Sequence, residues 1–546
     1  MEIQSHIGQV VQPPHAVPQG SADNVSPHGP PNVQLTREKL AVTASVAEVR
    51  PRRKPSYART GVSSLQQTGE VLRKFTKFVG PGILISVAYI DPDNFQTDVS
   101  SGALFRFKLL FMILISNIIA IFLQTLSAKL GSVTGMDLAQ MNRTFLPRWM
   151  NIVLWVMAEA AIICTDIGQV IGTAIALNLL VPKIPLMAGC ALSIVDTLFI
   201  LFFYRPEGSM RGLRAFEVFI AAIVLGVIIC FCIQLSMIED TAVSEVFRGY
   251  LPSAEIFRYE GLYESCAILG GTIMPHALYL GSSIVQARLR DFDVKNDHFH
   301  EYPSSDGGSS IPLYRPSLSA IRSCMSYSIA ELCITLFIIS IFVNSAILIV
   351  AAVSLSEGAA EADLFGMYAL FSTSISPAAA TLFALGLLFS GTSAGIVATM
   401  AGQMICEGAM NWRLSPFLRR LVTRSISIVP SIIVAAAAGR RGLSAALNGA
   451  NVALSVVLIF VTAPLILYTS RDKYMIVRTS DSVAHGDDET LERDPGFERQ
   501  DAANEPGTLS LANNWVTTGF GVLIWAVITF MNIATWVLMG LGKVDD

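Results

Sequence analysis

The chain has 546 residues, of which 52% are hydrophobic and only 15% are charged. A soluble protein carries charge on roughly a quarter of its residues, so this composition excludes a soluble globular protein and predicts one large membrane domain. The net charge of −4 does not point to nucleic acid as a partner. No nucleotide-binding loop or catalytic triad argues for an enzyme or a bound cofactor. The eight scattered cysteines include no CxxC pair, which argues against a zinc cage or a disulfide framework.

The first 75 residues are polar and rich in Pro, Ser and His, which is typical of a disordered tail. They contain no apolar core of a cleaved signal peptide. The basic cluster Arg52, Arg53 and Lys54 precedes the first apolar stretch and predicts a cytosolic tail, because basic residues stay on the cytosolic side.

Eleven apolar stretches follow, each about as long as the 20 residues that a bilayer requires. They lie at 79–103, 107–130, 149–181, 186–204, 215–237, 257–289, 323–353, 377–410, 416–438, 444–469 and 514–541. Arg211 and Arg214 are typical of the loops on one side, and Glu239 and Asp240 of the loops on the other. This bias places the N-terminus in the cytosol and the C-terminus outside. Arg440 departs from the pattern.

Two long polar segments, 291–322 and 470–513, are predicted to be mobile cytosolic loops through which regulatory partners could bind. Two glycosylation sequons, at Asn24 and Asn142, also fall on the cytosolic side. We expect both to stay unmodified, and a glycan on Asn142 would overturn the topology.

The first and the sixth apolar stretches are each interrupted at mid-membrane depth. GPG at 80–82 and IDPDN at 90–94 interrupt the first stretch, and GGTIMPH at 270–276 interrupts the sixth. Backbone can leave the helix at this depth only where it is buried in protein or lines a wet cavity. Two matching interruptions therefore predict one central site between facing broken helices.

The interruptions are five stretches apart, so the two copies would have opposite orientations. This predicts an all-α, LeuT-like inverted repeat of five plus five helices, with residues 76–237 and 257–469 as the repeats. The stretch 514–541 is then one extra helix.

The side chains at the interruptions form a ligand set for a transition metal. Asp91 and Asn94 are three residues apart and can direct both side-chain oxygens at one cavity. Pro275 lacks an N–H and so frees the carbonyl of Gly271 one turn earlier. The thioether of Met274 favours Mn²⁺ or Fe²⁺ over Ca²⁺ or Mg²⁺.

A polar stripe on the third apolar stretch predicts a path for protons or water. Glu159, Asp166 and Gln169 have spacings of seven and three, which place them on one helix face. Arg419, Arg420 and Arg424 could supply counter-charges, or could anchor the helix at the membrane interface.

Two further polar residues have two interpretations each. His276 either takes up a proton near physiological pH or stays neutral and bridges helices by hydrogen bonds. Asn451 either reaches the ion or bonds to a neighbouring helix.

These motifs, with the runs from Ala158 to Asp166 and from Val170 to Leu177, resemble the Nramp transporters, in particular their fungal branch. The resemblance covers about residues 75–470. It implies the inverted-repeat fold and proton-coupled uptake of Mn²⁺, Fe²⁺ and related ions into the cytosol.

The resemblance also implies roles for individual residues. It implies metal ligation by the side chains of Asp91, Asn94 and Met274 and by the carbonyl of Gly271. A proton and gating network would include His276, Glu159, Asp166 and Arg288.

The chain departs from the family pattern at four positions. Asp93 replaces a glycine and puts a second carboxylate close to Asp91, which could modify ion preference or release. Gln169 replaces a glutamate, and an amide cannot carry a proton. Asn451 replaces a glutamine and is shorter by one methylene, while Gly281 stands where bacterial members have histidine.

We therefore expect a secondary transporter of divalent metal ions that works by alternating access, with protons as co-substrate and the bilayer as its solvent. A metal-binding nutrient sensor without transport is the main alternative. A carrier of amino acids is disfavoured because Asp91 would repel a substrate carboxylate. The plasma membrane and the endosomal or vacuolar membranes all remain open.

Overall fold

The structure is a computed structural model. It describes residues 91–203, 210–238, 241–296, 301–302, 313–355, 362–412, 415–478 and 508–541, all within the unit Ser64–Asp546. The expected tail and the first half of the first interruption lie outside these residues, as do parts of both polar loops.

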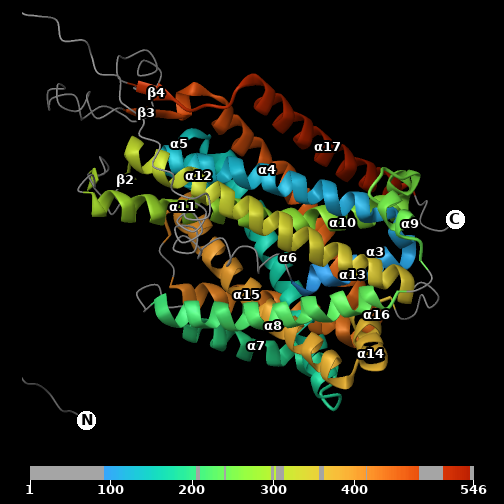
Figure 1. Ribbon diagram of the computed structural model, residues 1–546. Helices are drawn as coiled ribbons and strands as arrows, with labels where there is room; N and C mark the ends of the chain where they lie inside the picture. Colours follow the sequence, from blue (N-terminus) through green and yellow to red (C-terminus); the bar gives the residue numbers. More distant parts are fainter. Residues whose placement is uncertain are drawn as a thin grey trace, which may run out of the picture. The chain divides into compact units, whose positions relative to one another are not determined.

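The described chain is built from helices (Figure 1). The longer ones are α3 (Pro92–Phe105), α4 (Leu110–Thr134), α6 (Arg148–Leu180), α7 (Leu186–Phe203), α8 (Met210–Ser236), α10 (Tyr259–Ile273), α11 (Pro275–Lys295), α12 (Leu318–Thr335), α13 (Ile341–Ser354), α15 (Pro377–Met410), α16 (Pro416–Ser470) and α17 (Trp515–Gly540). The shorter ones are η1 (Arg106–Leu109), α5 (Leu138–Phe145), α9 (Val243–Arg248), η2 (Ala254–Phe257), the π-helical turn η3 (Leu336–Ser340), α14 (Leu364–Ser374) and η5 (Asp472–Tyr474). Strand β1 (Glu301–Tyr302) pairs with β2 (Leu313–Tyr314), and β3 (Ile476–Arg478) pairs with β4 (Thr508–Ser510), both antiparallel.

Helix covers most of the described part of every stretch that the sequence predicts to span the bilayer. Seven helical segments among the described residues are long and apolar enough to cross a membrane, and α7 and α8 contribute shorter apolar segments. The prediction of a helical, multi-pass membrane domain is confirmed. The inverted repeat stays a prediction, because residues 80–82 lie outside the description.

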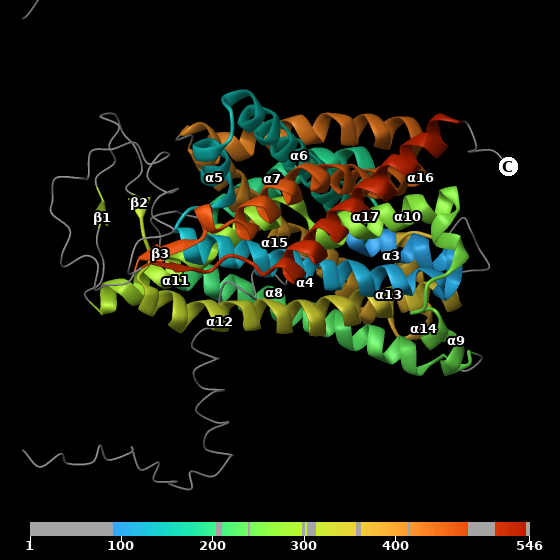
Figure 2. The same cartoon turned by 90° about the horizontal axis from the view of Figure 1, so that it is seen from above.

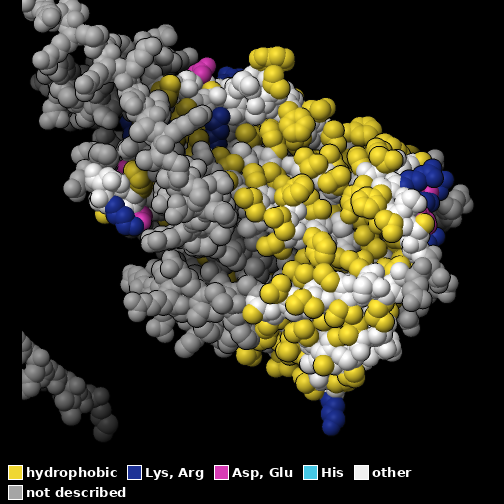
Figure 3. All heavy atoms as spheres, in the orientation of Figure 1, with side chains coloured by type: hydrophobic (Ala, Val, Ile, Leu, Met, Phe, Trp, Pro, Cys, Tyr) yellow, Lys and Arg dark blue, Asp and Glu magenta, His cyan; other side chains and the backbone are white. Residues whose placement is uncertain are grey.

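Hydrophobic side chains also cover the outside of the bundle. Figure 3 shows them over the middle of one face, with most of the visible charged side chains towards two opposite edges. Large apolar residues such as Phe337, Ile433 and Phe530 are well exposed. A face of this kind is stable in lipid, where apolar side chains need no cover.

The sequence predicts separate stretches at 416–438 and 444–469, and the structure agrees, because α16 consists of two helices joined across a break. The break is at Gly439, whose φ of 57° and ψ of −141° are accessible mainly to glycine. Next to it, Arg440 forms an ion pair with Asp363 and lies 4.5 Å from the ring centroid of Phe365. This local pairing explains why Arg440 departs from the charge pattern of the loops.

The expected mobile loop 291–322 is shorter than predicted. Helix α11 continues to Lys295 and α12 begins at Leu318. The buried Asp293 accepts a hydrogen bond of 2.6 Å from the hydroxyl of Tyr314, which fastens the end of this loop to α11. The ends of segment 470–513 are likewise joined by the β3–β4 pair.

Asn142 lies in α5 and its side chain is only 1% exposed. A glycan could not be attached there without unfolding the helix. The structure therefore gives an independent reason for the expectation that this sequon stays unmodified.

Candidate metal centre

Helix α3 begins at the predicted site. Asp91 is its N-cap, in an extended conformation, and Pro92 is the first helical residue, where a proline costs no hydrogen bond. The buried carboxylate of Asp91 accepts a 3.0 Å hydrogen bond from the backbone N–H of Asn94. The sequence Asp-Pro-Asp-Asn therefore makes a helix start with one carboxylate oxygen fixed by the cap.

The second interruption separates α10 from α11. Met274 stands between them with φ of 40° and ψ of 101°, so the backbone leaves the helix for this one residue, as the Pro275 signal predicts. Met274 is buried. Since Pro275 has no N–H, the carbonyl of Gly271 lacks its helical donor and instead accepts from Nδ2 of Asn94, at 3.3 Å.

Three helices meet at Gly271. A Cβ added to this residue would lie 2.1 Å from Oδ1 of Asn94 and 2.9 Å from Nδ2 of Asn451, so only glycine lets α3 and α16 come this close. Figure 2 shows α3 beside α10, and α3 and α10 each pack against α16 as well. The structure thus brings Asn94, Gly271 and Asn451 together, with Asp91 and Met274 adjoining them in the chain.

The donors at this place are oxygens and one sulfur. Oδ1 of the buried Asn451 has no hydrogen-bond partner among the described residues and is available to a ligand. No group of three His, Cys, Asp or Glu residues suited to a metal occurs in the described ranges. The candidate site therefore depends on amide oxygens, a carbonyl and a thioether beside a single carboxylate, a set that suits a borderline divalent ion.

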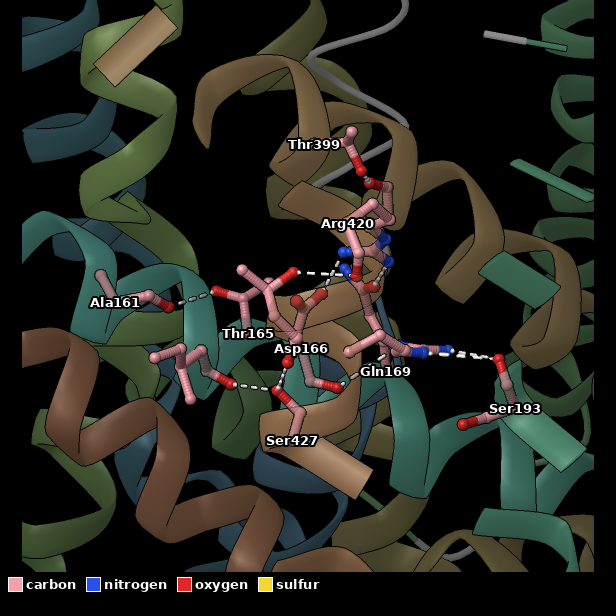
Figure 4. A network of polar contacts seen from close by, with 12 residues as sticks. Ala161, Thr165, Asp166, Gln169, Ser193, Thr399, Arg420 and Ser427 are labelled. Atoms are coloured by element: carbon pink, nitrogen blue, oxygen red, sulfur yellow. Dashed lines mark hydrogen bonds and ion pairs between the residues drawn. The ribbon is translucent and has the colours of Figure 1, made fainter. Parts of the chain in front are cut away.

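The predicted polar stripe of α6 meets two arginines of α16. Arg420 pairs with Asp166 and donates a 2.9 Å hydrogen bond to Oε1 of Gln169, as Figure 4 shows. Arg419 reaches Glu159 at 2.7 Å. Both arginines are buried and paired with carboxylates of α6, an arrangement that fits the counter-charge interpretation.

Arg424, one turn further along α16, is fully buried as well. It donates to the carbonyl oxygens of Ser193 in α7 and Asp166 in α6. This arginine therefore ties three helices together. Its partners are backbone atoms, which a reading of side-chain patterns does not reveal.

His276 and Arg288 lie in different surroundings. His276 is buried just past the interruption, and its Nδ1 has no partner among the described residues. Arg288 forms a 2.6 Å ion pair with Glu331 and donates a 3.0 Å hydrogen bond to Ser328, both in α12. These contacts fasten α11 to α12 and do not join Arg288 to the arginines of α16.

Asp93 faces α6. A Cβ on Gly168 would lie 1.9 Å from each carboxylate oxygen of Asp93, and one on Gly172 would lie 2.4 Å from Pro92. Two glycines one turn apart on α6 thus make room for the first turn of α3. The carboxylate of Asp93 is directed at α6, whereas Asn94 is directed at α10.

We expect Gly168→Ala to impair folding and transport, because the new methyl group would collide with Asp93. Overpacking of this kind costs about 1–3 kcal/mol. Asp93→Gly in the same chain should restore the thermal midpoint, since it removes the colliding carboxylate. Gly519→Ala is the control, because a Cβ there meets nothing within 4 Å. Thermal unfolding in detergent checks this, and an unaltered midpoint for Gly168→Ala would contradict the packing described.

Sequence reasoning missed a buried polar cluster beside the site. It consists of Thr97, Ser100 and Ser101 of α3, Glu264 of α10 and Asn448 of α16. One signal was present in the sequence, since Glu264 is an ionisable residue within a stretch predicted to span the membrane. Its partners could not be identified from the sequence because they lie 163 and 184 residues away.

The family model described as natural resistance-associated macrophage protein-like matches residues 82–483. The chain is 45% identical over 516 residues to the manganese transporter SMF1 of Saccharomyces cerevisiae, with 89% of each chain covered. It is 45% identical over 474 residues to the iron transporter SMF3 of the same yeast, with 85% of this chain and 96% of the relative covered. A crystal structure of the Eremococcus coleocola manganese transporter matches with a TM-score of 0.67 and 27% identity, covering 87% of this chain and 90% of the other.

These similarities, together with the multi-pass helical fold and the buried site between α3, α10 and α16, define a membrane transport protein and not an enzyme. The chain belongs to the Nramp family.

Proposed function

We propose that this protein carries divalent transition-metal ions, Mn²⁺ and Fe²⁺ foremost, through the membrane towards the cytosol. The observation that carries this proposal is the buried Met274 at the interruption between α10 and α11. Met274 lies three residues after Gly271, whose carbonyl accepts a hydrogen bond from Asn94. A thioether next to amide and carbonyl oxygens prefers borderline ions to Ca²⁺ and Mg²⁺. The similar yeast proteins named as manganese and iron transporters agree with this preference.

The ion would replace the hydrogen bond between Asn94 and Gly271. Without an ion, Nδ2 of Asn94 satisfies the carbonyl of Gly271. When a cation enters, that carbonyl and Oδ1 of Asn94 turn to it, and Asp91 supplies the negative charge. Met274 and Oδ1 of Asn451 complete the site. Because these ligands come from α3, α10 and α16, movement of one helix against the others would open the site to one side at a time.

Protons would be carried by groups on the α6 side of the site. Glu159, Asp166 and His276 are the titratable candidates, with Arg419 and Arg420 as fixed counter-charges. Gln169 cannot carry a proton and instead orients Arg420 through its amide oxygen. Arg288, with its partner Glu331, would act in gating by holding α11 to α12.

The proposed orientation has the N-terminus in the cytosol, from the distribution of basic residues in the loops. The tail and the polar segments at 291–322 and 470–513 would then face cytosolic regulatory partners. Transport from outside the cell or from an organelle lumen would both end in the cytosol.

Uptake into proteoliposomes tests the proposal. The purified full chain should take up Mn²⁺ and Fe²⁺ with saturation, and an inward proton gradient should accelerate the uptake. Absence of flux for every divalent ion, with or without the gradient, would reject transport. Tight binding of Mn²⁺ without flux would favour a metal-binding sensor instead. Flux that is unchanged by the proton gradient would reject proton coupling but not metal transport.

A further inference from the structure

Glu264 is a buried carboxylate with three hydrogen-bond donors and no basic partner among the described residues. Its side chain is 5% exposed. Oε2 accepts from the hydroxyls of Ser100 at 3.1 Å and Ser101 at 3.2 Å, and Oε1 accepts from Nδ2 of Asn448 at 2.9 Å. All of these bonds are donated to Glu264, so it serves purely as an acceptor.

A chain of hydrogen bonds leads from Glu264 to the candidate metal site. Asn448 accepts at its Oδ1 from the hydroxyl of Thr97, at 3.1 Å. Thr97 in turn accepts at Oγ1 from Nδ2 of Asn451, at 2.9 Å. Thr97, Asn448 and Asn451 are all buried, so water does not compete for these groups. The remaining atom, Oδ1 of Asn451, has no partner in the described part of the chain.

In this row of hydrogen bonds, the direction of each bond follows from the direction of the one before it. In its ionised form the carboxylate of Glu264 only accepts, so Asn448 then turns its NH₂ to Glu264 and its oxygen to Thr97. The hydroxyl of Thr97 has one proton, which it gives to Asn448, so its oxygen can only accept from Asn451. Asn451 must therefore present its NH₂ to Thr97. Its oxygen is then the atom left without a partner among the described residues.

We propose that Glu264 is a positioning residue that acts through Asn448 and Thr97 to turn the oxygen of Asn451, and not its NH₂, towards the transported cation. An amide in the opposite orientation would place two N–H groups at a site for a positive ion and would repel it. This inference rests on the proposed function, because it assumes that the cation binds beside Asn451.

The direct test is Glu264→Gln, which keeps the size of the side chain but adds an NH₂ group. A glutamine can donate to Asn448, so the amides of Asn448 and Asn451 are no longer held in one orientation. We expect the affinity for Mn²⁺ to fall about tenfold, the scale found when groups that orient a metal ligand are altered. Calorimetric titration of the full chain in detergent measures the affinity, and thermal unfolding without metal should be little changed.

A double-mutant cycle separates positioning from other roles. In the background of Asn451→Ala, the change Glu264→Gln should have no further effect on Mn²⁺ affinity, because no amide remains to be turned. Thr97→Val should behave like Glu264→Gln, since it removes the hydroxyl that links Asn448 to Asn451. Ser101→Ala is the control, because it removes a donor to Glu264 that lies outside the route to Asn451.

Three outcomes would count against the inference. Unchanged affinity in Glu264→Gln overturns it, and so does an effect that adds fully to that of Asn451→Ala, which would make Glu264 a direct cation ligand or a packing residue. Absence of saturable Mn²⁺ binding by the unaltered chain would overturn the proposed function and this inference with it. If the unaltered chain binds Mn²⁺ and Glu264→Gln binds it with the same affinity, the inference is rejected and the proposed function is not.

Discussion

Replacing Asp91 by asparagine is expected to abolish saturable Mn²⁺ uptake while the protein stays folded. Asp91 is the one carboxylate of the proposed ligand set. Attraction between two unit charges 4 Å apart is about 4 kcal/mol at an effective dielectric constant of 20, or roughly a thousandfold in affinity. Asparagine keeps the oxygen that caps α3 through the N–H of Asn94, and it is a good N-cap. The fold should therefore survive the loss of charge.

Titration with Mn²⁺ and uptake into liposomes measure the effect of Asp91→Asn. Asp98→Asn is the matched control, because Asp98 is another buried carboxylate of α3 that lies outside the ligand set. Its effect on affinity should be much smaller. Wild-type affinity in Asp91→Asn, or equal losses in both variants, would show that Asp91 does not bind the ion.

Replacing Met274 by alanine is expected to change which ions are carried. Without the thioether, the remaining donors at the site are all oxygens, which suit hard ions such as Ca²⁺ and Mg²⁺. Discrimination between Mn²⁺ and Ca²⁺ should fall by about tenfold, the effect of one contact worth ~1.4 kcal/mol. Transport of Mn²⁺ should continue at reduced affinity.

Competition between Ca²⁺ and Mn²⁺ for uptake tests this second prediction. Met367→Ala removes a methionine that is buried elsewhere, in α14, and controls for loss of packing alone. The ion ranking should stay as in the wild type for Met367→Ala and change for Met274→Ala. If both variants keep the wild-type ranking, the sulfur of Met274 does not select the ion.

Local sequence signals predicted the elements that depend on local chemistry. Pro275, four residues after Gly271, predicted both the end of α10 and the freed carbonyl, since the missing N–H is a property of the residue itself. The spacing of Glu159 and Asp166 likewise placed them on one face of α6.

Features that depend on distant contacts could not be predicted in the same way. The direction of Asp93 is set by the glycines of α6, and the role of Glu264 by residues in α3 and α16. Arg424 uses backbone carbonyls, which every residue carries, so no side-chain pattern identifies its partners.

The most direct test of the account is the location of the ion. Crystals of the full chain loaded with Mn²⁺, measured at the manganese absorption edge, should show one strong anomalous peak in the membrane domain. The account predicts that this peak lies within ligand distance of Asp91, Asn94, Met274 and the carbonyl of Gly271. A peak elsewhere in the bundle, with Met274 turned away from it, would contradict the account.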